Sequence, residues 1–166
     1  MRKIATFLMI LSFAIQASAQ SPMFIDSVRS NSTWPDIREY AVTYLPDNYT
    51  SAKRYPLILF FHGAGESGTT KADLAKIYNS STAGGPAYYI VHGGWPDSFY
   101  NYKNGKYYQP IVICPQAGGS WSTDYKVVSV LIQELLTRYS IDTNRIYLTG
   151  LSAGGWTTWN YSAHYQ

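Results

Sequence analysis

The sequence is poor in several features that would define a class of protein. It contains one cysteine, Cys114, which excludes an internal disulfide and, within an apolar run, is expected to be a buried core residue. Its 13 Lys and Arg against 10 Asp and Glu leave little net charge, which argues against nucleic acid as a partner. It shows no metal-ligand cluster and no glycine loop for phosphate, so we expect neither metal nor cofactor.

Long apolar runs are also scarce, and the one at the N-terminus has the pattern of a secretory signal peptide. Two basic residues precede an apolar stretch at positions 4–15, and Ala17-Ser18-Ala19 is a small-residue cleavage site. The alternative is an ordinary N-terminal helix. We predict a signal over residues 1–19, a mature chain over 20–166 that is secreted or periplasmic, and no membrane association after cleavage. Removing two basic residues leaves 11 Lys and Arg against 10 acids.

The most informative stretch present is Gly150-Leu151-Ser152-Ala153-Gly154, which has the G-x-S-x-G pattern. A short apolar strand precedes it and a helix is expected from about Ala153, so the serine falls on a sharp turn between strand and helix. Glycines are needed on both sides because a Cβ there would clash with neighbouring backbone. The non-catalytic alternative is a glycine-rich turn with an exposed serine.

A second motif, His62-Gly63-Ala64-Gly65, follows the apolar strand at 57–61. A loop after an early strand can supply a backbone N–H to an oxyanion hole, the second donor beside the one that follows the serine. The two motifs together favour a catalytic serine over a glycine-rich turn with an exposed serine.

The remaining pattern predicts an open, mainly parallel α/β sheet flanked by helices. Strands are expected at 38–45, 57–61, 111–114 and 145–148, with an edge strand or ordered arm before residue 35. Apolar residues at three- and four-residue spacing predict a helix over 124–139, capped by Ser122 or Thr123, and a short helix is expected near 71–78. The long tyrosine-rich stretch at 79–109 is expected to form a wall of the substrate cleft.

With these motifs placed, the chain resembles the α/β-hydrolase fold. The resemblance is closest to secreted esterases and predicted peptidases, including polyhydroxybutyrate-depolymerase-like and feruloyl- or acetylxylan-esterase-like enzymes. It rests on the segments 55–66, on Ile113-Cys114-Pro115-Gln116 with Trp121, and on 141–155. It covers about residue 40 to the end, as the N-terminal part of one such domain, truncated after the serine turn.

The resemblance implies a role for each motif residue. Ser152 would be the nucleophile. The oxyanion donors would be the N–H of Ala153 and that of Ala64, with Gly65 as second choice. His62 would be structural, with its ring tied to the backbone. Trp121 has two equal alternatives, a core aromatic or a wall of the substrate cleft.

The sequence departs from the active pattern because no Asp or Glu follows Ser152. The fold places an acid and then a histidine after the serine. The only later histidine, His164, is carried away by the intervening helix, and His92 has no evident acid partner. We therefore expect a fragment of a longer hydrolase, with the strand before Ser152 left as an exposed edge.

Three functions remain open from the sequence. The first is a serine hydrolase that cleaves carboxylic esters, including esters on plant polysaccharide or polyester, with the fragment itself nearly inactive. The second is a serine peptidase of the same fold. The third is a non-catalytic carbohydrate-binding module, which the aromatic stretch from Trp95 to Trp121 motivates. The expected partner is an ester or peptide substrate.

Overall fold

The computed structural model describes residues 23–27, 37–79, 85–119, 121 and 125–165. The predicted signal peptide and the capping residues Ser122 and Thr123 lie outside the described residues. The strands are β1 (Met23–Ser27), β2 (Ile37–Tyr44), β3 (Tyr55–Phe61), β4 (Phe99–Asn101), β5 (Lys106–Tyr108), β6 (Ile111–Ala117) and β7 (Ile141–Gly150). The helices are η1 (Ala64–Glu66), η2 (Lys71–Leu74), α1 (Ala75–Tyr78), α2 (Pro86–Val91), α3 (Lys126–Arg138) and α4 (Ala153–His164), the two η segments being 3₁₀ turns.

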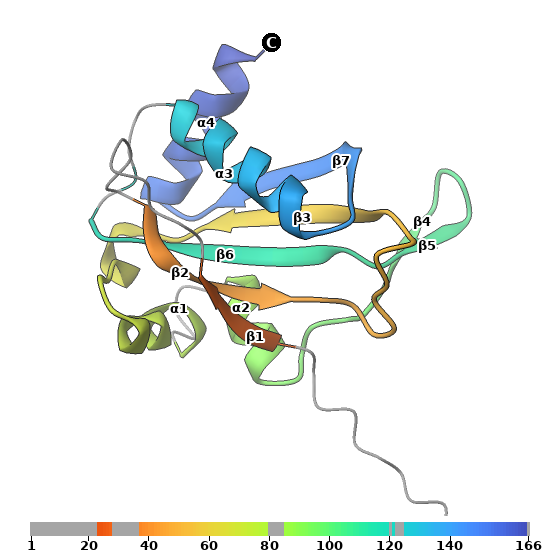
Figure 1. Cartoon of the computed structure of the whole chain (residues 1–166), viewed down its shortest axis with the longest axis horizontal. Helices are drawn as coiled ribbons and strands as arrows, with labels where there is room; N and C mark the ends of the chain where they lie inside the picture. Colours follow the sequence, from red (N-terminus) through yellow and green to blue (C-terminus); the bar gives the residue numbers. More distant parts are fainter. Residues whose placement is uncertain (1–22, 28–36, 80–84, 120, 122–124, 166) are drawn as a thin grey trace, which may run out of the picture.

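Five strands form the central sheet, in the order β1-β2-β6-β3-β7 (Figure 1). Strand β3 pairs in parallel with β6 on one side and with β7 on the other, whereas β2 runs antiparallel to both of its neighbours. Four of the five strands therefore point the same way. The predicted α/β architecture, a mainly parallel sheet with flanking helices, is confirmed.

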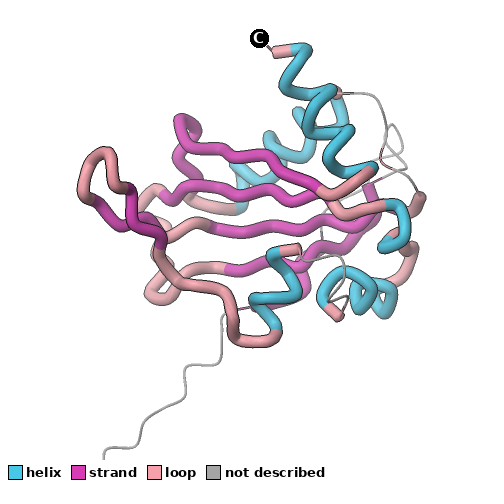
Figure 2. The backbone as a smooth tube through the Cα atoms, turned by 180° about the vertical axis from the view of Figure 1, so that it is seen from behind, coloured by secondary structure: helices cyan, strands magenta, loops and turns pink. Residues whose placement is uncertain are grey.

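Helices cover both faces of the sheet because its central strands are apolar on both faces (Figures 1 and 2). On one face, Leu57, Leu59 and Phe61 of β3 pack with the apolar side of α3, and residues of α4 join them. On the other face, Phe60, Val112 and Cys114 pack with α1 and α2. Cys114 is fully buried as expected, and burial raises the pKa of its thiol to about 12.

The sequence order of strands and helices brings two loops to one end of the sheet. Because β3, β6 and β7 are parallel, the loops that follow them leave from the same edge. The loop after β3 contains His62 to Glu66, and the turn after β7 contains Ser152. These are the two motifs predicted to act together.

Strand β7 lies at the edge of the described sheet, where it pairs only with β3. Its outer edge is open, as the sequence predicted for the strand before the serine. None of the helices that the structure describes is long and apolar enough to cross a membrane.

Candidate active site

Ser152 occupies a strained turn between β7 and α4. Its backbone has φ 49° and ψ −114°, a conformation that side chains with a Cβ adopt only when the surrounding structure holds them there. Its side chain is exposed and makes no capping hydrogen bond to α4. The hydroxyl is thus presented at the carboxyl end of the sheet, at the start of a helix.

The glycines on either side of the serine are fixed by backbone contacts. A Cβ on Gly150 would lie 2.4 Å from the carbonyl carbon of Gly154. A Cβ on Gly154 would lie 2.0 Å from the carbonyl oxygen of Phe61 and 2.7 Å from that of His62. Only hydrogen fits at both places, so the G-x-S-x-G pattern reflects the close packing of α4 on β7 and on the end of β3.

The same packing sets the serine turn against the His-Gly-Ala-Gly loop. The N–H of Leu151 donates to the carbonyl of Phe61 at 3.0 Å, and the Leu151 side chain lies 3.6 Å from where a Cβ on Gly63 would be. The N–H groups of Ala153, Ala64 and Gly65 donate no hydrogen bond to any residue that the structure describes. Both loops therefore offer unused backbone donors at this end of the sheet, the requirement for an oxyanion hole.

His62 holds the start of this loop and is completely buried. Its Nε2 accepts from the N–H of Ala117 at 2.9 Å, so the proton is on Nδ1, which donates to the carbonyl of Gly63 at 2.6 Å. Burial lowers the pKa of His62, although the Gly63 bond opposes this. The ring is neutral and tied to the backbone, and the expected structural role is confirmed.

Glu66 is a further site residue that the sequence analysis missed. Its carboxylate is buried and accepts from the N–H of Gly63 at 2.8 Å, which closes the loop on itself. Burial raises the pKa of Glu66, and the Gly63 hydrogen bond works against that increase. The amide of Gln116 in turn donates to the carbonyl of Glu66 at 3.1 Å, so the end of β6 braces the loop. The sequence signal for this role was the position of Glu66, an acidic residue three positions after the loop glycine Gly63.

Trp121 belongs to the core. Its side chain is only 5% exposed and its ring meets that of Phe61 edge to face, with centroids 4.9 Å apart. The indole N–H donates to the carbonyl of His62 at 2.7 Å. Of the two alternatives, the structure supports the core aromatic and leaves no face of the ring for a substrate. Trp121 acts on the site indirectly, through the backbone of His62.

The two other histidines, His164 and His92, do not lie beside Ser152. His164 ends α4 and stacks on Tyr125, with ring centroids 3.3 Å apart. At about 1.5 Å per residue, the helix carries it roughly 18 Å from the serine. His92 caps α2, on the opposite face of the sheet from α4, and its Nδ1 bonds the carbonyl of Tyr88 at 2.8 Å. No group of three or more potential metal ligands occurs in the described parts of the chain.

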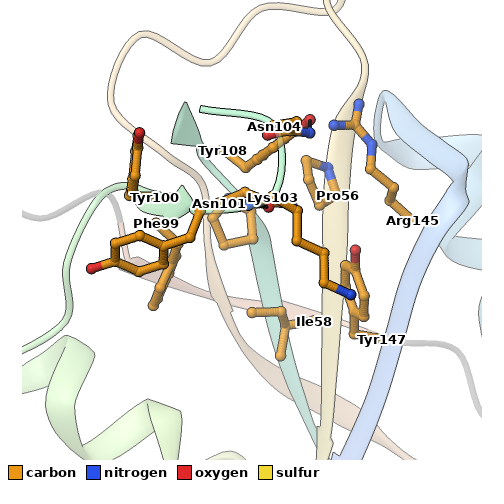
Figure 3. A pocket seen from close by; sticks show the side chains of 12 residues that line it. Pro56, Ile58, Phe99, Tyr100, Asn101, Lys103, Asn104, Tyr108, Arg145 and Tyr147 are labelled. Atoms are coloured by element: carbon orange, nitrogen blue, oxygen red, sulfur yellow. Dashed lines mark hydrogen bonds between the residues drawn. The ribbon is translucent and has the colours of Figure 1, made fainter. Parts of the chain in front are cut away.

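The tip of the tyrosine-rich stretch, residues 99–108, does not form a wall beside Ser152, which corrects that expectation for the tip; residues 80–84 of the stretch lie outside the described residues. Its tip folds into the hairpin β4–β5, which projects from the end of the sheet opposite to the start of α4 (Figure 1). The hairpin faces Pro56 and Ile58 of β3 and Arg145 and Tyr147 of β7 across a pocket of about 770 Å³ (Figure 3). The error arose because a chain can return to either end of the sheet before its next strand, and composition does not specify which.

The sheet order, the helices on both faces of the sheet and the turn at Ser152 are those of the α/β-hydrolase fold. The structure is similar to that of a thermostable esterase, with a TM-score of 0.55 and 27% identity over 84% of this chain and 36% of that one. It also aligns with a ferulic acid esterase from Anaeromyces mucronatus (TM-score 0.47, 20% identity, 80% of this chain and 49% of that one). A third is esterase 2 of Thermogutta terrifontis (TM-score 0.46, 15% identity, 84% and 46%).

No protein-family model matches the sequence, and no curated protein matches it. The chain spans between about a third and a half of the length of these esterases.

Proposed function

We propose that this chain forms the N-terminal part of a serine hydrolase that cleaves carboxylic esters. The observation that carries the proposal is Ser152, held at φ 49° with an exposed hydroxyl beside a loop in which the N–H groups of Ala64 and Gly65 are unused. In the reaction, the Ser152 hydroxyl attacks the ester carbonyl and loses its proton to a base. The alcohol leaves, an acyl-enzyme forms, and water then releases the acid.

The N–H groups of Ala153 and Ala64, with Gly65 as the alternative to Ala64, are the proposed donors to the tetrahedral oxyanion. Removing one such donor typically raises the barrier by about 3 kcal/mol. Because they are backbone groups, the loop that carries them must be held in place. His62, Glu66 and Trp121 supply that support through the bonds described above.

The base and its orienting acid are proposed to come from further chain that packs beside β7. The thermostable esterase is longer than this chain, and two features of the structure also support the proposal of further chain. The outer edge of β7 is open, and the side chains of Trp156 and Trp159 on α4 are 58% and 65% exposed. An open strand edge beside large exposed aromatics is typical of a surface that contacts more protein.

The proposal is tested with a fluorophosphonate probe on a longer protein that contains this chain. The probe should label Ser152, and Ser152→Ala should abolish labelling. Ser162→Ala, which changes another exposed serine of α4, should leave it intact. Absence of label at Ser152 would refute the nucleophile. Assays with acylated sugars and with peptides then separate an esterase from a peptidase of the same fold.

The 166-residue chain alone is proposed to be marginally stable and nearly inactive, because a serine without a base is a poor nucleophile at neutral pH. Ester turnover by this chain that Ser152→Ala removes would contradict the external base. Secretion is likewise proposed, from the signal pattern at 1–19. Sequencing the N-terminus of exported protein tests it, and a start at Met1 would exclude cleavage.

A further inference from the structure

The pocket between the β4–β5 hairpin and β7 is separate from the serine site. Its walls are the hairpin segment 99–104 on one side and Arg145 and Tyr147 of β7 on the other, with Pro56 and Ile58 of β3 as its floor (Figure 3). Tyr147 lies three residues before the end of β7 at Gly150, which is roughly 10 Å along the strand at about 3.3 Å per residue, and Ser152 lies beyond the turn that follows. Its volume of about 770 Å³ lies within the range of about 300–1,000 Å³ common for small-molecule sites.

Aromatic side chains with exposed faces line this pocket. Phe99, Tyr100 and Tyr102 of the hairpin segment are 39%, 42% and 90% exposed, and Tyr147 on the facing wall is 56% exposed. So many large exposed aromatics at one place indicate a binding surface. Three of the four are tyrosines, whose hydroxyl groups would have to find polar partners if an apolar protein segment covered them. A ligand that combines apolar faces with hydroxyl groups meets both needs.

The walls are braced before any ligand binds. Tyr100 packs on Tyr102 and Tyr107, with ring centroids 4.9 and 5.0 Å apart. The Arg145 guanidinium lies 4.7 Å from the ring centroid of Tyr108, whose hydroxyl accepts from Asn104 at 2.8 Å. A wall that is already ordered loses less conformational entropy when it binds, which favours recognition of a weakly held ligand.

The residues that line the pocket carry positive charge and no negative charge. No acidic side chain is among its lining residues. Arg145 is paired with Asp142 at 2.6 Å, whereas Lys103 forms no ion pair with any described residue. One uncompensated ammonium group is too little for a nucleic-acid backbone, but it can pair with a single carboxylate.

We propose that this pocket binds a segment of a polysaccharide, with sugar rings against the aromatic faces and Lys103 beside the carboxylate of an acidic sugar. Pyranose rings present C–H groups on their faces and hydroxyl groups at their edges, which matches aromatic walls with phenolic tips. The site holds the polymer away from Ser152. It does not depend on the proposed hydrolase function, because binding needs no turnover.

Isothermal titration calorimetry of the longer protein that contains this chain, with oligogalacturonides and with neutral xylo-oligosaccharides, tests the proposal. Both should bind, the acidic probe several-fold more tightly. Tyr147→Ala should weaken binding at least tenfold, whereas Tyr147→Phe should retain most of it. Lys103→Ala should remove the preference for the acidic probe.

Two control variants separate this site from other surfaces. Tyr89→Ala changes a tyrosine of α2 that is 46% exposed and lies outside the pocket, and Ser152→Ala removes the nucleophile; neither should alter binding. Tyr102→Ala, at a side chain 90% exposed, provides a second pocket variant if Tyr147→Ala does not fold. Absence of binding to both probes, or equal binding by the pocket variants and the wild type, would overturn the proposal. An unchanged preference in Lys103→Ala would overturn the role of the charge.

Discussion

A Cβ on Gly154 would lie 2.0 Å from the carbonyl oxygen of Phe61, so the first turn of α4 rests directly on the backbone at the end of β3. This contact joins the two motifs that the sequence keeps about ninety residues apart. The segment that carries the serine and the segment that carries the loop N–H groups meet here without any side chain between them. Their relative position is set by backbone, which makes it insensitive to side-chain motion.

Gly154→Ala should therefore destabilise the fold strongly. The added methyl group cannot be accommodated unless α4 moves away from β3, and we expect a loss of about 3 kcal/mol in the free energy of unfolding. Urea denaturation followed by circular dichroism measures it. Gly65→Ala is the matched control, because a Cβ there has no neighbour within 4 Å, and its effect should stay within about 0.5 kcal/mol. Equal effects would show that the packing is looser than described.

The strain at Ser152 gives a second prediction, from a pair of variants that both remove the hydroxyl. Ser152→Gly should raise the free energy of unfolding by about 0.5–1 kcal/mol, because glycine adopts φ 49° without steric cost. Ser152→Ala keeps the Cβ, so the strain persists and stability should change by less than about 0.5 kcal/mol. Thermal unfolding of both variants at one pH is sufficient. A glycine variant no more stable than the alanine variant would contradict the strain.

Local signals made much of this predictable from the sequence. The apolar runs of β3 and β6 and the periodicity of α3 each depend on neighbouring residues, and the helix and strands appear where these patterns place them. Gly150 and Gly154 give the same kind of local signal, because their role follows from the single turn between β7 and α4. The chain's own pattern thus indicated the sheet, the helix cover and the position of Ser152.

Relations between distant residues were not predictable in the same way. Strand β6 follows β3 in sequence but lies between β2 and β3 in the sheet. Trp121 donates to a carbonyl 59 residues earlier, and no local pattern distinguishes such a tryptophan from one that lines a cleft. The hairpin's position at the far end of the sheet has the same origin. These features depend on how the sheet assembles, and the assembly is defined only when all the strand pairings are known.

Trp121→Phe should destabilise the loop that begins at His62. Phenylalanine keeps an aromatic ring in the core, but it removes the N–H that satisfies the carbonyl of His62. Leaving a buried acceptor unpaired, together with the lost ring volume, should cost about 2–4 kcal/mol of unfolding free energy. Trp159→Phe, at a side chain 65% exposed, should cost less than about 0.5 kcal/mol. Chemical denaturation compares them, and similar losses would show that the Trp121 hydrogen bond contributes little.

Glu66 gives a prediction about pH. Its pKa is raised in the folded chain above the ordinary value of 4.5, chiefly by burial. Between that ordinary value and the folded pKa, the folded chain binds more protons than the unfolded chain, so this group's contribution to stability falls as pH rises. The contribution is fully present below about 4.5 and is lost as pH increases through the folded pKa.

The variant Glu66→Gln isolates this effect because its amide oxygen can still accept from the N–H of Gly63 and its side chain has no proton to titrate. The free energy of unfolding of wild type minus that of Glu66→Gln should therefore decrease as the pH is raised from 4 toward neutrality. Urea titrations of both proteins at several pH values measure this difference. Parallel curves would mean that Glu66 titrates alike in the folded and unfolded chains, and the carboxylate that closes the oxyanion loop would then be solvated rather than buried.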